Sequence, residues 1–126
     1  MIEYTVKVDE YGDRRWYLNG KLHREDGPAI EYANGTRFWF LNDNCHREDG
    51  PAIECSDGRR FWYLNDKRHR EDGPAVEYTD DRCRRRWYLD GVEYTEEEFN
   101  KKTLKVKELT VAEIEALLGY QIKVVK

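Results

Sequence analysis

The chain has 126 residues, 38% of them charged and 13% aromatic, and it carries a net charge of −4 at pH 7. This length suits one domain with a modest core, and the aromatic content argues against a disordered chain. The small negative charge excludes a function that depends on a strong overall attraction to phosphate.

The cysteine and hydropathy patterns exclude further classes of protein. Cys45, Cys55 and Cys83 have no C-x-x-C spacing and are odd in number, which argues against a zinc site and a disulfide framework. No run of about 18 apolar residues is present, and the N-terminus lacks the features of a signal peptide. We therefore expect a single domain, residues 1–126, in a reducing cytoplasm, without membrane contact, cofactor or metal.

Residues 1–11 are predicted to form an N-terminal capping strand. Apolar side chains alternate there with polar ones, as in a half-buried strand, at Ile2, Tyr4, Val6 and Val8. An open array of hairpins leaves unpaired edges that other chains can join. We expect this strand to pair with the first repeat and to cover that edge.

A repeat with a period of 23 residues occupies residues 12–94. Complete copies begin at Arg14, Arg37 and Arg60, and a partial copy begins at Arg85 after a two-residue insertion. A single unit of this size cannot bury its own apolar face, so neighbouring units are expected to stack. The motif HREDGPA occurs once in each complete copy, at residues 23–29, 46–52 and 69–75.

Each copy contains two short strand-like stretches that are separated by turns. The first is R-x-W-x-L and the second is AIEY or a close variant, and both are rich in β-branched or aromatic residues. The sequence predicts a mainly β protein, a meander of short antiparallel hairpins. The turn signals are Asn19-Gly20 or Asn42-Asp43 after the first stretch, and Asn34-Gly35 or Asp57-Gly58 after the second.

Alternation along R-x-W-x-L divides its side chains between two faces. One face is predicted to form the shared core and carries Trp16, Trp39, Trp62 and Trp87. The first arginine of each copy is expected to cover the edges of these rings. The other face is the predicted partner-binding surface, made of Arg15, Tyr17, Phe38, Phe40, Phe61, Tyr63, Arg86 and Tyr88. Rings and arginines commonly anchor interfaces. Burial of this second face, by twist or by the C-terminal segment, is the alternative.

The HREDGPA motif is predicted to be a structural joint. Its Asp-Gly pair favours a tight turn, its proline starts the next strand, and histidine can bond to open backbone groups. Equivalent histidines of stacked units would lie about 9 to 10 Å apart, too far to share a zinc ion bound at about 2.0 to 2.3 Å. No catalytic residue is assigned. The structural repeat residues are His23, His46 and His69, together with Gly27, Gly50 and Gly73, which can take the positive φ of a tight turn.

Residues 95–126 are predicted to form a small β-α-β cap. Two Thr-x-x-Glu capping boxes each open a helix, and alternating apolar residues on both sides of the second helix predict strands near 104–106 and 122–124. The helices are expected near residues 96–101, after Thr95 and with Glu98, and near 111–118, after Thr110 and with Glu113.

The repeat unit resembles a divergent MORN-type repeat over residues 12–94. The resemblance lies in the order aromatic-x-Leu-Asn-Gly-Lys-x-His, then Gly-Pro-x-x-x-Tyr, then a second Asn-Gly or Asp-Gly. HREDGPA stands where the usual unit has His-Gly-x-Gly. The resemblance implies a β-hairpin solenoid that serves as a binding scaffold, and it does not imply catalysis. We expect a non-enzymatic protein.

The HREDGPA form and the tail TVAEIEALLGYQIKVV also resemble phage-encoded proteins. That resemblance implies an accessory protein, monomeric or homodimeric, that binds and inhibits a host factor in the host-cell cytoplasm, for example a CRISPR effector. Nucleotide or nucleic-acid binding is the alternative, because arginines interleaved with rings can hold phosphates and stack on bases; the cluster concerned is Arg82, Arg84, Arg85 and Arg86.

Overall fold

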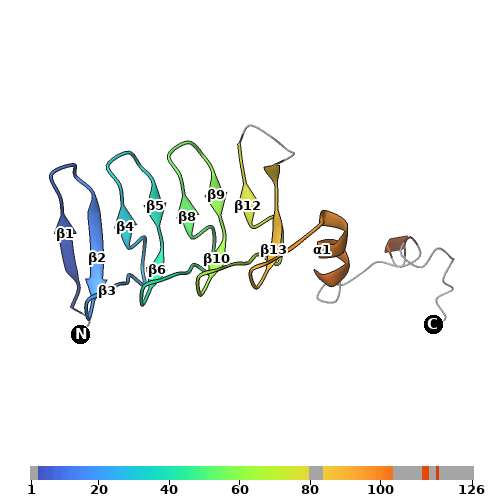
Figure 1. Cartoon of the computed structure of the whole chain (residues 1–126), viewed down its shortest axis with the longest axis horizontal. Helices are drawn as coiled ribbons and strands as arrows, with labels where there is room; N and C mark the ends of the chain where they lie inside the picture. The colour runs from blue at the N-terminus through green and yellow to red at the C-terminus, as the bar shows by residue number, and fades with distance from the viewer. Residues whose placement is uncertain (1–2, 80–83, 104–111, 114–115, 117–126) are drawn as a thin grey trace.

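The computed structural model describes residues 3–79, 84–103, 112–113 and 116. It confirms a mainly β protein in which short antiparallel hairpins follow one another along the chain, with a helix on the C-terminal side (Figure 1). The described strands form an open sheet and several two-stranded hairpins, and they do not close into a barrel.

Two kinds of hairpin alternate along the chain: those whose strands build the main sheet, and small two-stranded ones. The elements are β1 Thr5–Val8, β2 Arg14–Leu18, β3 Lys21–Leu22, β4 Ile30–Glu31, β5 Arg37–Phe38, β6 Phe40–Leu41, β7 Asn44–Cys45, β8 Ile53–Glu54, β9 Arg60–Phe61, β10 Tyr63–Leu64, β11 Lys67–Arg68, β12 Val76–Glu77, β13 Trp87–Leu89, β14 Val92–Tyr94 and α1 Glu96–Thr103. The main sheet has the order β1-β2-β4-β5-β8-β9-β12, with β3 paired to β2. The small hairpins are β6-β7, β10-β11 and β13-β14.

The turn chemistry of the two hairpins differs as the sequence predicts. In the small hairpins both central residues have positive φ, as at Asn42 (49°) and Asp43 (66°), which is the type I′ geometry that matches strand twist. In the main-sheet hairpins a single glycine has positive φ, 96° at Gly35 and 93° at Gly58. Asparagine, aspartate and glycine accept this region at little cost, so the turns fix the lengths of both hairpins.

The register of the main sheet places equivalent residues in rows. Ile30 lies opposite Phe38, and Ile53 lies between Phe38 and Phe61. The adjacent row alternates arginine with glutamate on the other face, and such opposed charges stabilise neighbouring strands. This second row consists of Arg14, Glu31, Arg37, Glu54, Arg60 and Glu77.

The N-terminal strand pairs with the first repeat, as predicted. β1 is antiparallel to β2, with Val6 opposite Trp16. The predicted half-burial is wrong for Val6 and Val8, which are both exposed, whereas Tyr4 is half-buried. β1 is the outermost strand of the sheet and has a neighbouring strand on one side only, so its alternating pattern does not correspond to a buried face.

The core differs from the predicted one. Its most buried residues are small: Ala29, Ala52 and Ala75 are each 0% exposed. The four tryptophans, by contrast, are only half-buried. Each alanine lies where the backbone passes between two repeats: the N–H of Ala52 donates to the Phe61 carbonyl and its carbonyl accepts from the Trp39 N–H, both at 2.8 Å. A larger side chain at this position would separate the strands, which explains the small residue.

The C-terminal helix α1 confirms the first capping box. The Thr95 N–H donates to Glu98 Oε1 at 3.0 Å, and the Glu98 N–H donates to Thr95 Oγ1 at 3.1 Å. Phe99 and Thr103 are buried, and the helix contacts β13 and β14. Ala112, Glu113 and Ala116 of the second predicted helix are helical, whereas the rest of that helix and both predicted strands of the cap lie outside the described residues.

Among the described residues, no helix has both the length and the apolar character needed to span a membrane.

Candidate functional site

The arginine of HREDGPA organises the loop of every complete repeat. The Arg47 guanidinium lies over the Trp39 ring, with Cζ 4.0 Å from the ring centroid. Its Nε donates to Asp49 Oδ1 at 2.9 Å, and its Nη1 donates to the Pro51 carbonyl and to Glu54 Oε1, both at 3.1 Å. Arg24 and Arg70 make the corresponding contacts.

This arginine corrects one prediction from the sequence. The pattern places the first arginine of each copy against the tryptophan, but Arg14, Arg37, Arg60 and Arg85 are exposed. Their place beside the ring is taken by the loop arginine, because the HREDGPA loop folds back over the sheet. The available signal is the constant pair of carboxylates two and seven residues after that arginine, as in Asp49 and Glu54 after Arg47.

The motif glycines also have a role other than the predicted one. Gly27, Gly50 and Gly73 are absent from the positive-φ residues, so the prediction of a left-handed turn there is wrong. A Cβ atom at Gly50 would lie 3.1 Å from the Arg47 Cζ, and the distance at Gly73 is 2.9 Å from Arg70 Cζ. Glycine lets the guanidinium pack directly against the backbone, and a Cβ atom there would push the arginine head away from its present position.

The motif histidines connect neighbouring repeats. His46 Nδ1 accepts a hydrogen bond from the backbone N–H of Asn65, in the type I′ turn of the next repeat, at 3.0 Å. Its Nε2 lies 3.4 Å from Glu48 Oε1. The same link joins His23 to Asn42 and His69 to Asp90. Each of these histidines thus accepts a hydrogen bond from an open backbone N–H group, and that group lies in the adjacent repeat.

A second link joins neighbouring repeats, and it was not predicted from the sequence. The Asp66 carboxylate accepts from the Cys45 N–H at 2.7 Å, and the Asp66 N–H donates to the Cys45 carbonyl at 2.9 Å. Asp43 makes the same pair of bonds with Leu22. The sequence feature that indicates this link is Asn-Asp, which replaces Asn-Gly at the two inner turns. Burial raises the pKa of the Cys45 thiol to about 12, so this cysteine is a neutral core residue.

We expect His46→Ala to lower the free energy of unfolding by about 1 to 2 kcal/mol, because the Asn65 N–H loses its acceptor inside a tight turn. His46→Asn is the matched variant, since an amide oxygen can occupy the place of Nδ1, and it should recover most of that loss. Urea unfolding monitored by tryptophan fluorescence measures both. Equal losses for the two variants would show that the imidazole acts through packing and not through the hydrogen bond.

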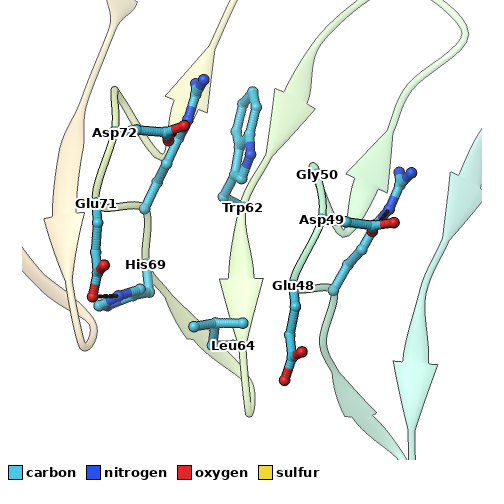
Figure 2. Close-up of a pocket in the computed structure, with 10 residues that line it drawn as sticks. Glu48, Asp49, Gly50, Trp62, Leu64, His69, Glu71 and Asp72 are labelled. Carbon is cyan, nitrogen blue, oxygen red and sulfur yellow. Dashed lines mark hydrogen bonds and ion pairs between the residues drawn. The ribbon is translucent and has the colours of Figure 1, made fainter.

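Two grooves lie between consecutive loops. The first groove runs between the loop of residues 24–28 and Trp39, and the second runs between residues 47–50 and Trp62. Their volumes are similar, about 640 and 690 Å³. Figure 2 shows the second groove, with Trp62 standing between Asp72 of its own repeat and Asp49 and Gly50 of the preceding one.

The predicted partner-binding residues lie on the other face of the strands and line neither groove. Tyr17, Phe38, Phe40, Phe61 and Tyr63 are half-buried, as is Arg15, while Arg86 is exposed. We call the five rings the aromatic face. Tyr88 does not belong to it: it is 7% exposed and packs against Ala75 and Val76, which leaves little of its ring for a partner.

Rings and arginines contact one another along the aromatic face. Phe38 stacks on Phe40 with centroids 6.2 Å apart. Arg68 donates to the hydroxyl groups of Tyr63 and Tyr88, at 3.1 and 3.2 Å. These contacts restrain the rings of Phe38, Phe40 and Tyr63.

No group of three or more His, Cys, Asp and Glu side chains within the described part of the chain is placed to hold a metal ion. The chain matches no protein-family model, and comparison with curated proteins and with solved structures also finds no significant match. Its function is therefore inferred from its own residues.

Proposed function

We propose that the chain is a non-enzymatic repeat scaffold that binds another protein through the aromatic face. The observation that carries this proposal is the series of half-exposed rings at equivalent positions of successive repeats, Tyr17, Phe40 and Tyr63 among them. Rings fixed by internal contacts lose little conformational entropy on binding, which makes them effective interface anchors.

We also propose that the stacked hairpins form a MORN-like solenoid with the N-terminal strand and the C-terminal segment as caps. The equivalent links made by His23, His46 and His69 support this view, because each repeat bonds to the next in the same way. The resemblance to phage proteins leads us to propose a host defence factor, such as a CRISPR effector, as the partner in the host-cell cytoplasm.

Affinity capture from a lysate of the bacterial host tests the proposal. We expect the wild-type chain to retain one host protein, and Phe40→Ala or Phe61→Ala to reduce capture about tenfold, the loss typical of an interface anchor. Circular dichroism and thermal unfolding must show that each variant is folded. Retention of the same protein by both folded variants at wild-type levels would refute the aromatic face as the contact.

Nucleic-acid binding is the second candidate, because cation–π pairs occur along the same face. Arg15 lies 5.8 Å from the Tyr32 centroid and Arg84 lies 5.5 Å from that of Tyr78, and such pairs suit stacking on bases. Binding of a fluorescent single-stranded oligonucleotide discriminates between a nucleic-acid ligand and a protein partner. Binding that weakens steeply with salt, together with nuclease-sensitive capture, would favour this candidate over a protein partner.

A further inference from the structure

The two grooves carry a second site that is independent of the aromatic face. Each groove has a floor of one tryptophan and one leucine, Trp39 with Leu41 in the first and Trp62 with Leu64 in the second. Because the sequence repeats, the two floors have the same composition and the same orientation relative to the sheet. A ligand that fits one groove therefore fits the other.

One side of each tryptophan already binds a cation. Arg70 Cζ lies 3.9 Å from the Trp62 centroid, and Arg70 belongs to the same loop as Glu71 and Asp72. In Figure 2 the opposite side of Trp62 looks toward Asp49 and Gly50 across the second groove. That side combines an aromatic surface with nearby carboxylates, which is the environment that holds Arg70 on the first side.

The groove walls have an excess of negative charge. Two arginines and four carboxylates line each groove. The arginines are engaged in their own loops, as Arg47 is with Asp49 and Glu54. The carboxylates stay accessible to solvent even where they pair within their own loop: the side chains of Glu48 and Asp49 are 84% and 85% exposed. Glu48 and Asp49 line both grooves. The complementary ligand is therefore a cation with an apolar or planar stem.

The spacing of the grooves selects the shape of the ligand. Each repeat adds two strands to the main sheet, β4 and β5 and then β8 and β9, so equivalent points lie about 9.6 Å apart at about 4.8 Å per strand. A polyproline II helix advances about 3.1 Å per residue and completes one turn in about three residues. Side chains at every third position of such a helix project on one side about 9.3 Å apart, which matches the groove spacing.

We propose that the two grooves bind a basic polypeptide segment in an extended, polyproline II-like conformation, with arginine or lysine side chains three positions apart. Each cation enters one groove between the tryptophan and the carboxylates of the preceding loop. The guanidinium of arginine suits the site better than an ammonium group, because it stacks on the indole and bonds two carboxylate oxygens together. This site requires no contribution from the aromatic face.

Fluorescence anisotropy with labelled synthetic peptides tests the proposal on the intact chain. The probe contains the series Arg-Pro-Pro-Arg-Pro-Pro, and its control, Arg-Arg-Pro-Pro-Pro-Pro, has the same composition with adjacent arginines. We expect the spaced peptide to bind about tenfold more tightly, since only it can place one cation in each groove. Equal affinity of the two peptides would overturn the proposal.

Paired protein variants locate the site. Glu48→Gln should weaken binding of the spaced peptide severalfold because Glu48 lines both grooves. Glu97→Gln is the control for charge, since Glu97 lies on α1 and pairs only weakly with Lys101 at 3.5 Å. Equal effects of the two variants would show general charge attraction and refute the site. If light scattering reveals a dimer that Glu48→Gln dissociates and that the peptide does not, the grooves bind a second copy and the proposal is refuted.

Because Glu48 and Phe40 lie on different faces, the outcomes here and in the capture experiment are separable. Loss of host-protein capture in Phe40→Ala with unchanged peptide binding would support two distinct sites. If the capture experiment fails, the peptide measurement still decides whether the grooves bind a basic segment.

Discussion

Replacing Arg47 with alanine is expected to lower the free energy of unfolding by about 2 to 3 kcal/mol. The variant loses the contact with Trp39 and three hydrogen bonds that close the loop. Cation–π contacts and hydrogen bonds to charged groups are each worth about 1 to 2 kcal/mol when partly desolvated. The sum is reduced by solvent screening, because Arg47 is 22% exposed, and because Glu54 keeps Arg37 as a partner at 3.2 Å.

Urea unfolding at neutral pH measures this loss, and Arg59→Ala is the control. Arg59 pairs with Asp57 at 2.8 Å, but the two side chains are 45% and 57% exposed, and such surface pairs contribute about 1 kcal/mol or less. A similar small loss for both variants would show that the loop arginine is one more surface charge and not the organising residue of the repeat.

The pH dependence of stability offers an independent measurement of the same contact. The hydrogen bond and the charge of Arg47 hold the pKa of Asp49 below its ordinary value of 3.8. A carboxyl group with a lowered pKa in the folded state stabilises the fold above its unfolded pKa, and that stabilisation is lost as the pH falls. The wild-type chain should therefore lose this contribution below about pH 4, whereas Arg47→Ala should lose much less, because Arg47 is the main cause of the lowered pKa.

The features that the sequence predicted correctly are local ones. Asn42-Asp43 and Asn34-Gly35 indicate their turns because few residues accept positive φ, whatever surrounds them. The Thr95 and Glu98 capping box works in the same way, since both of its bonds lie within one helical turn. With turns at a period of 23 residues, a meander of antiparallel hairpins is nearly the only arrangement the chain can adopt.

The features that the sequence did not predict depend on contacts between segments that are far apart in the chain. Trp39 is apolar and constant in type, which favours a place in the core, but its ring is covered by Arg47 and faces a groove instead of a second layer. The carboxylates that follow Arg47 indicate that it is paired, but they do not show that it covers that ring in place of Arg37. The choice is made by the path of the HREDGPA loop, which is a tertiary property.

The candidate sites also combine features that the local sequence predicts with features that depend on contacts between distant segments. Strand alternation correctly separated the phenylalanines from the tryptophans, so the composition of the aromatic face was available from the sequence. The position of Tyr88 in the repeat predicts a place on that face, yet it is buried because the fourth copy ends the array beside Ala75 and Val76. The grooves could not be foreseen, because their walls come from two different repeats.

Replacing Ala52 with leucine is expected to have the largest effect, a loss of about 3 kcal/mol in the free energy of unfolding. Ala52 is 0% exposed, and its N–H and carbonyl are fixed by 2.8 Å bonds to strands of two successive repeats. Neither strand can withdraw without breaking those bonds, so the added carbons must distort the joint between repeats.

Thermal and urea unfolding of three variants provide the measurement. Ala52→Val should give an intermediate loss that can be measured even where leucine abolishes folding, and Ala33→Leu, at an exposed position, should change stability by less than about 0.5 kcal/mol. If Ala52→Leu were as stable as Ala33→Leu, the alanines would not be a close-packed core. The joint between repeats would then depend mainly on the hydrogen-bonded loops and on the links made by the histidines.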